Sequence, residues 1–468
     1  MNSEFFHDHP QCPELVSRYE NTVEAGILAS WKEEEFIQLV EFYEREKLFD
    51  RALEVTGQGI QQFPDKLEFY LRKSRLLLRC EREDMAAAVL DEAERLAPNE
   101  VDIPLLRAEI LIALELYEDA HTLLQSIDEL DNPVTLSKVF YREALLFEKT
   151  EQYESMFYAL RAALEENPAN RQALEKMWLC MELSKRYEES ILLHEQILDE
   201  DPYSYLAWYN LGHALAYLGR YEEAIEAYEF AFVINEKFEF AYRDCAEICF
   251  ELKKYRKALR YYSEVLEHFA PDHDLLLRIG QCHQLLHHFG IAKSFFERAL
   301  RLDPMNDEVF FHIGECLAQE GDFENAIKLY LKAIRIEDRR EEYFASLAKT
   351  CDRLGRTDEA EQYFRQATEI APESTEYWTQ YAEFLMRQSL FEQALEVLLE
   401  AEDYSVGPEL LYGQITCLFA LGRRQEALLT MEVALEEDFP LHIHLFHQLP
   451  ELKDDPEVLA MIAAFQPY

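Results

Sequence analysis

The chain has 468 residues, of which 49% are hydrophobic and 29% are charged, so it can bury a large core and is too apolar for a disordered protein. Asp and Glu number 92 against 46 Lys and Arg, which gives a formal net charge of −46 at pH 7. Proteins that hold phosphates neutralise them with Lys and Arg, and this surface would repel a polyanion or an anionic membrane face. The composition therefore argues against binding to nucleic acid.

Targeting signals and cysteine usage indicate the compartment. The first twenty residues contain no basic segment followed by an apolar run, so no secretory signal is expected. No run of 18 consecutive apolar residues occurs, and we predict no insertion into a membrane. The nine cysteines are an odd number spread along a long chain, unlike the disulfide framework of a small secreted protein. These features predict a cytoplasmic protein.

The first segment in chain order spans residues 1–32. Leu15, Tyr19, Val23 and Ile27 recur at spacings of four, which places them along one side of a helix. The repeats that follow would expose apolar surface at the end of their array without a cover. We therefore predict that residues 1–32 form an N-terminal capping segment.

A repeat of about 34 residues fills positions 33–441. Nine of the eleven steps between successive units are 34 residues long, and the other two are 36 and 33. Alanine stands at the twentieth place in ten of the twelve units, which is far from a chance distribution. The units open at Glu33, Leu67, Val101, Ser137, Arg171, Tyr205, Glu239, His273, Asp307, Glu341, Thr375 and Pro408.

Each unit has the pattern of two short amphipathic helices. Apolar residues recur at spacings of three and four in both halves of the unit, as expected for one stripe on each helix. One hairpin cannot bury both stripes, but stacked hairpins can merge them into a continuous core. Glycine favours a left-handed helix end, and proline cannot continue a helix. Glycines stand between the two halves at Gly219, Gly321, Gly355 and Gly422, and prolines close six units at Pro64, Pro98, Pro168, Pro202, Pro304 and Pro372.

The unit that opens at Tyr205 resembles the tetratricopeptide repeat, and the whole chain resembles the long arrays of such repeats found in bacteria. The residues that carry the resemblance are Trp208, Leu211, Gly212, Leu215, Ala224, Tyr228 and Ala231. The resemblance covers residues 33–441 and implies an all-α fold. It implies a right-handed superhelical solenoid of about twelve helix-turn-helix hairpins with helical caps.

Repeats two to four depart from this pattern. Lys73, Arg107 and Glu143 occupy the seventh place, which is usually apolar, and the step from Val101 to Ser137 is two residues longer than the usual 34. The packing register should be least regular in this part of the chain.

The last segment spans residues 442–468. Pro456 is suited to the first turn of a helix, because its missing N–H would have no partner there. Val458, Leu459, Ile462 and Phe465 follow on one side of that helix. We predict a C-terminal capping helix that covers the last hairpin.

Several groups of residues have side chains that can bind metals. Each also has a structural interpretation, since ligands at a terminus can meet by chance and buried cysteines are small core residues. No phosphate-binding glycine loop and no G-x-S-x-G motif occurs. We therefore predict no catalytic, metal or cofactor site. The groups are His7, Asp8, His9 and Cys12; His442, His444 and His447; His283, His287 and His288; and Cys245 with Cys249.

The resemblance implies that the first helices line a concave groove, with places 2, 5, 9, 12 and 13 of each unit facing it. Aromatic side chains there could anchor a partner, and carboxylates could steer a basic one. An acidic stripe can equally be a solvated face. The candidate protein-binding residues are Tyr209, His213, Tyr217, Phe240, Arg243, Glu247, Phe250, Glu251, Phe311 and Glu315.

These observations predict a non-catalytic scaffold or adaptor that binds a basic or amphipathic protein segment in an acidic groove. The alternative is a structural protein that assembles with itself, or fills out a larger complex, through its ends or its convex face. Chaperone adaptors of the family grip a C-terminal carboxylate with Lys at the fifth and Asn at the ninth place of one repeat. No unit here has that pair, so such a ligand is not expected.

Overall fold

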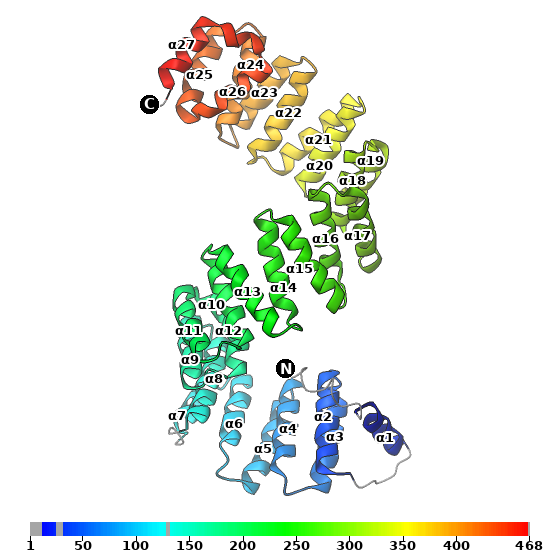
Figure 1. Cartoon of the computed structure of the whole chain (residues 1–468), viewed down its shortest axis with the longest axis vertical. Helices are drawn as coiled ribbons and strands as arrows, with labels where there is room; N and C mark the ends of the chain where they lie inside the picture. The colour runs from blue at the N-terminus through cyan, green and yellow to red at the C-terminus, as the bar shows by residue number, and fades with distance from the viewer. Residues whose placement is uncertain (1–11, 25–30, 128–131, 467–468) are drawn as a thin grey trace. The chain divides into compact units, whose positions relative to one another are not determined.

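The structure is a computed structural model that describes residues 12–24, 31–127 and 132–466. Within these residues the chain forms α-helices and two short 3₁₀ helices, and no strand. Two compact units divide the chain, Met1–Ala241 and Tyr242–Tyr468. In each unit, consecutive helices pair into antiparallel hairpins (Figure 1). The all-α hairpin architecture predicted from the repeat is therefore confirmed.

Twelve hairpins follow one another between residues 33 and 437. Ten of their first helices begin at the residue that opens the predicted unit. The pairs are α2 (Glu33–Arg45) with α3 (Phe49–Gln62), α4 (Leu67–Arg79) with α5 (Glu83–Leu96), α6 (Asp102–Ala113) with α7 (Tyr117–Gln125), α8 (Pro133–Lys149) with α9 (Tyr153–Glu166), α10 (Arg171–Ser184) with α11 (Tyr187–Glu200), α12 (Tyr205–Tyr217) with α13 (Tyr221–Ile234), α14 (Glu239–Glu251) with α15 (Tyr255–His268), α16 (His273–Leu285) with α17 (Phe289–Leu302), α18 (Asp307–Glu320) with α19 (Phe323–Ile336), α20 (Glu341–Arg353) with α21 (Thr357–Ile370), α22 (Thr375–Arg387) with α23 (Phe391–Ala401), and α24 (Pro408–Ala420) with α25 (Arg424–Glu437).

The fourth hairpin starts earlier than the predicted unit. Its first helix α8 begins at Pro133 and not at Ser137. The Asn132 side chain accepts hydrogen bonds from the backbone N–H groups of Val134 and Thr135, and Pro133 takes the first helical position, where it needs no hydrogen bond. This local capping signal adds a turn to the helix in the segment where the repeat step is longer.

Each hairpin turns through one residue with positive φ. The four glycines predicted for this role have φ between 73° and 87°. The other eight hairpins place Lys, Glu, His or Ser there, with φ between 55° and 62°, a conformation that costs a residue with a Cβ atom about 1 kcal/mol or more. These eight residues are Lys47, Glu81, Glu115, Glu151, Lys185, Lys253, His287 and Ser389. The six closing prolines lie two residues beyond a second helix, as their missing N–H requires.

Small residues on first helices let the two helices of a hairpin approach closely. A Cβ atom added at Gly212 would lie 2.8 Å from the ring of Tyr228 and 3.2 Å from the carbonyl oxygen of Ala224. Gly314 meets the ring of Tyr330 in the same way, at 2.7 Å. Large aromatic side chains of the second helices thus fill the space that glycine leaves, and both tyrosines are buried.

Short helical segments lie at both ends of the repeats. The N-terminal helix α1 (Cys12–Glu24) buries Leu15 and Tyr19 in a cluster with Trp31 and residues of α2. Val23 is exposed, and Ile27 lies outside the described residues. At the other end the 3₁₀ helix η1 (Phe439–His442), α26 (Ile443–Gln448), the 3₁₀ helix η2 (Pro450–Asp454) and α27 (Pro456–Phe465) follow α25.

The predicted C-terminal helix begins at Pro456, where the Asp455 carboxylate accepts hydrogen bonds from the N–H groups of Glu457 and Val458. Val458 is buried in one cluster with Leu445 of α26 and Met431 of α25. The segment after the last repeat therefore covers apolar surface of the last hairpin with two helices rather than one.

Candidate functional site

The first helices of the hairpins are α2 to α24 in even numbers. In each unit separately, we call the side that they present the first-helix face. In the first unit this face contains a cavity of about 330 Å³ between α10 and α12. Its lining is aromatic and amphipathic, which is typical of sites that anchor a protein or ligand. The residues that line it are Arg171, Leu174, Glu175, Trp178, Tyr205, Leu206, Tyr209, Asn210, Asn235, Lys237, Phe238 and Phe240.

Aromatic rings contact one another along one side of this cavity. Phe238 lies edge-on to Tyr209 with 5.0 Å between ring centroids, and Phe240 lies 5.9 Å from Phe238. His213 lies edge-on to Trp178 at 6.0 Å. Ring contacts of this kind hold side chains in place at little entropic cost, so the aromatic surface is preorganised.

The predicted residues of the first unit play different parts in this surface. Tyr209 is buried and forms the floor, whereas Phe240 is 64% exposed at the rim. His213 lies 3.2 Å, from Nδ1 to Oη, from Tyr228 of the second helix α13. Tyr217 is 46% exposed and stacks on Tyr187 at 4.8 Å.

The predicted residues on α14 belong to the second unit, and two of them form ion pairs with neighbouring groups. Arg243 binds the Asp272 carboxylate at 2.7 Å, and Glu247 binds the Arg278 guanidinium at 3.0 Å. These contacts border a cavity of about 330 Å³. Its lining also includes Tyr262, Asp274, Leu275, Leu277 and Glu308.

Two further predicted residues of α14 lie beside these ion pairs. The guanidinium carbon of Arg278 lies 5.0 Å from the centroid of the Phe250 ring, within reach of a cation–π interaction. The ring of Phe250 also lies edge-on to Tyr255 at 5.5 Å. Glu251 is exposed at the end of α14. Arg278 therefore holds both a carboxylate and an aromatic ring of the preceding first helix.

Phe311 and Glu315 on α18 are held by rings of neighbouring helices. Phe311 is half-buried, with its ring 4.7 Å from Tyr343 and 5.7 Å from Tyr330. The Tyr330 hydroxyl donates a 2.6 Å hydrogen bond to Glu315, and burial together with this carboxylate raises the pKa of Tyr330. Both residues lie on the first helix α18, and their contacts with Tyr330 and Tyr343 stabilise the packing of this helix against its neighbours.

A recurring contact links successive first helices. Glutamate at the ninth place of one repeat binds arginine at the sixth place of the next in three pairs, with nitrogen to oxygen distances of 2.5 to 3.0 Å. Gln281 and His312 make the equivalent contact as a hydrogen bond of 2.9 Å. The three ion pairs are Glu41 with Arg72, Glu109 with Arg142, and Glu247 with Arg278. Three carboxylates of the first helices, among them the predicted Glu247, are therefore neutralised within the chain.

Trp178 and Phe238, which complete the aromatic cavity, were not predicted from the sequence. Trp178 stands at the eighth place of its repeat, where neighbouring repeats carry glycine or alanine, and is 38% exposed while Met177 beside it is buried. A bulky residue at a place that demands a small one is the signal that could have revealed it. Phe238 precedes its helix and lies outside the places assigned to the groove.

The groups considered as metal ligands lie as follows. His283 and His288 approach to 3.5 Å between their Nδ1 atoms, and burial lowers the pKa of His283. His287 is the turn residue of its hairpin. Cys245 and Cys249 are buried core residues. Among the described residues, no cluster of three or more His, Cys, Asp or Glu side chains could hold a metal ion.

The other two groups of candidate metal ligands lie near the two ends of the chain. The rings of His444 and His447 are 6.4 Å apart, and His442 is hydrogen-bonded to the Phe439 carbonyl oxygen. His7, Asp8, His9 and the side chain of Cys12 lie outside the described residues.

Models of the tetratricopeptide repeat family match residues 205–238, 273–306, 308–373 and 353–407. The sequence has no significant match among curated proteins. None of the described helices is both long and apolar enough to span a bilayer.

Several solved structures are similar to this fold. The APC/C hetero-tetramer Cut9–Hcn1 has a TM-score of 0.39 and 13% identity over 84% of this chain and 97% of that one. YrrB, a TPR protein with an unusual peptide-binding site, has a TM-score of 0.34 and 19% identity over 39% of this chain and 95% of its own. MamA has a TM-score of 0.33 and 18% identity over 34% and 94%.

Proposed function

Because the chain is a tetratricopeptide repeat protein, we propose that it acts as a non-catalytic scaffold that binds a protein segment on its first-helix face. The proposed ligand is an amphipathic, basic segment. The observation that carries this proposal is the aromatic cavity between α10 and α12, where rings held by mutual contact leave about 330 Å³ of space.

Aromatic residues in preorganised pockets supply much of the binding energy at protein interfaces. Phe240 offers exposed apolar area at the rim, and Tyr209 provides a buried floor. The apolar side of an amphipathic segment would contact these rings. Its basic side would be steered by the net charge of −46, an attraction that salt screens over about 8 Å at physiological ionic strength.

The experiment compares two variants of the first unit in a native lysate. Phe240→Ser removes a 64% exposed ring from the cavity rim, and Leu192→Ser removes a 61% exposed side chain from the second helix α11. Both changes leave the core intact. We expect Phe240→Ser to lose partners that the wild type and Leu192→Ser retain, with all retention weaker at higher salt. Equal retention by both variants would refute binding at this cavity.

Self-association through the second helices is the alternative function. Exposed apolar side chains on these helices favour it, including Val233 at 69% and Leu429 at 66%. The charge of the chain opposes it, since like-charged copies repel. Light scattering at two salt concentrations separates the two functions, because salt would promote a homo-oligomer and weaken the grip on a basic partner.

A further inference from the structure

The last two repeats break the recurring contact between the ninth and sixth places. Glutamate occupies the ninth place in five repeats, as Glu41, Glu109, Glu247, Glu315 and Glu383. The first three bind arginine of the next repeat, and Glu315 accepts a hydrogen bond from Tyr330. Glu383 has no hydrogen bond or ion pair with any residue that the structure describes. The residue at the sixth place of the next repeat is Gly413, which has no side chain to offer.

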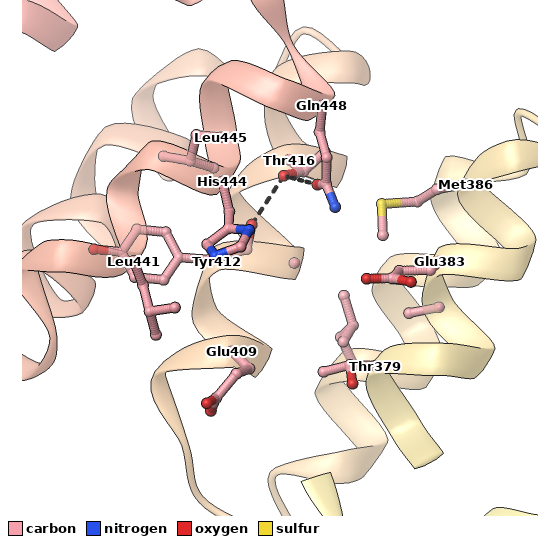
Figure 2. Close-up of a pocket in the computed structure, with 13 residues that line it drawn as sticks. Thr379, Glu383, Met386, Glu409, Tyr412, Thr416, Leu441, His444, Leu445 and Gln448 are labelled. Atoms are coloured by element: carbon pink, nitrogen blue, oxygen red, sulfur yellow. Dashed lines mark hydrogen bonds between the residues drawn. The ribbon is translucent and has the colours of Figure 1, made fainter. Parts of the chain in front are cut away.

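A cavity lies beside this unmatched glutamate. It has a volume of about 190 Å³ and lies between α22, α24 and the capping helix α26. Figure 2 shows Glu383 and Met386 of α22 pointing towards α24 and α26, whereas the ring of Tyr412 on α24 points away from α22. An apolar cavity of about 150 Å³ holds a benzene molecule, so this one has room for a long side chain.

The lining of the cavity combines apolar walls with carboxylates, and it also includes the imidazole of His444 on α26. Ala382, Leu398, Leu441 and Leu445 supply apolar surface, and Glu409 is a second carboxylate without a hydrogen bond or ion pair among the described residues. Thr416 of α24 donates a 2.8 Å hydrogen bond to Gln448 of α26, which links the two helices at this wall of the cavity (Figure 2). Such a lining suits a side chain with an aliphatic stem and a cationic head.

The arginines of this region are bound elsewhere. Between α22 and α27 the sequence has three of them, Arg387, Arg423 and Arg424. Arg387 binds Asp352, Arg423 binds Glu426, and Arg424 binds both Asp455 and Glu457. The described part of this region therefore supplies no arginine of its own to Glu383.

We propose that this cavity, which we call the Glu383 pocket, receives an arginine side chain from an extended protein segment. The guanidinium would take the place that Arg72, Arg142 and Arg278 take in other repeats, between successive first helices. Arginine is the cation used in all three internal pairs, and its planar fork can bind a carboxylate with two parallel hydrogen bonds. This proposal rests on the proposed function, because it takes the ligand to be a protein segment bound by first helices, here those of the second unit.

The test uses the full chain with methionine methyl groups labelled with ¹³C, because Met386 lines the pocket. The probes are capped pentapeptides Ala-Leu-X-Leu-Ala in which X is arginine, citrulline or glutamate. Citrulline has the shape of arginine without its charge. The Met386 resonance is assigned from its loss in Met386→Leu, and its shift is followed as each peptide is added.

We expect the arginine peptide to shift the Met386 resonance in a saturable manner, and the citrulline and glutamate peptides to bind at least tenfold more weakly. Glu383→Gln should weaken the arginine peptide at least tenfold, whereas Glu432→Gln on the second helix α25 should leave it unchanged. Gly413→Arg supplies the missing side chain from within and should prevent binding. Its added Cβ atom would meet only the flexible end of Leu398, so the fold should persist.

An unshifted Met386 resonance, or equal binding of the arginine and citrulline peptides, would overturn the Glu383 pocket. So would equal binding by the wild type and Glu383→Gln. These results are independent of the Phe240→Ser experiment, which lies in the other unit and tests the scaffold function itself. If the arginine peptide bound to the Glu383 pocket but Phe240→Ser retained all partners, the Glu383 pocket would be supported and binding at the aromatic cavity would be refuted.

Discussion

Substituting Gly280 with alanine tests how closely the helices of a hairpin approach. Gly280 lies on α16, and an added Cβ atom would stand 2.4, 2.6 and 2.9 Å from three carbons of the Phe296 ring on α17. Phe296 is fully buried, and its ring is stacked on that of His312 with 5.5 Å between centroids. The ring cannot retreat from the new methyl group without moving His312 or separating the two helices.

The expected size of the effect follows from two opposing contributions. Overpacking of a core costs about 1–3 kcal/mol, whereas replacing glycine by alanine inside a helix gains about 1 kcal/mol. Because three ring carbons lie within 3.0 Å of the added Cβ atom, the overpacking cost should be in the upper part of its range, about 2–3 kcal/mol. Gly280→Ala should therefore destabilise the protein by about 1–2 kcal/mol after the helical gain is subtracted. Gly57 on α3 is the matched control, because nothing lies within 4 Å of its added Cβ atom. Gly57→Ala should stabilise by about 0.5–1 kcal/mol, so the two substitutions should have opposite signs.

Urea unfolding followed by circular dichroism gives the total change in stability, and peptide-level hydrogen exchange locates it in α16 and α17. Local measurement matters because long repeat arrays need not unfold in one cooperative step. Adding Phe296→Leu should relieve the clash, so the double variant should be more stable than the sum of the single changes predicts. If Gly280→Ala were as stable as the wild type, the close approach would not be a constraint. The tenth repeat accommodates Ala348 with Phe364 at these places, so such a result would mean that hairpins shift freely between the two geometries.

Two further predictions concern pH and turn geometry. His194 is fully buried, and burial lowers its pKa from 6.5 to about 4, so the unfolded chain binds a proton first as the pH falls. The contribution of neutral His194 to the unfolding free energy should be fully present above pH 6.5 and should decrease by about 3 kcal/mol towards pH 4. His194→Phe should lack this part of the decrease when the unfolding free energies of the two proteins are measured across the same pH range. Lys185 turns its hairpin with φ of 55°, so Lys185→Gly should raise stability by about 1 kcal/mol in urea unfolding. Gly219→Ala, at φ of 75°, should lower it by a similar amount, and the same sign for both would contradict the assignment of these turns.

The candidate site could be predicted only in part. The places assigned to the first-helix face include Tyr209 and Phe240, which line one cavity, but the tertiary structure gives them different parts as buried floor and exposed rim. Glu247 was expected as a carboxylate for a partner, and the structure pairs it with Arg278. A side chain on the first-helix face is available for binding only if no residue of the next repeat pairs with it, as Arg278 pairs with Glu247. The pattern within a single repeat does not contain that information.

The repeat period, the hairpin unit, four of the turns and the ends of six helices were already determined by the sequence, because they depend on local constraints. Alanine and glycine are favoured where two backbones meet, glycine tolerates positive φ, and proline cannot continue a helix. The first helix of the fourth hairpin was the exception, since the capping residues before Pro133 moved its start.

Only the tertiary structure decided which carboxylates stay unmatched. Glu383 and Glu247 occupy the same place in their repeats, yet one meets Gly413 and the other meets Arg278. The difference arises between repeats, where side chains 31 to 33 residues apart come within hydrogen-bonding distance. The cap helix α26 then closes one side of the space at Glu383, because a stack of hairpins must cover its last apolar face. Local rules determine the repeating unit, and contacts between units determine where a partner can bind.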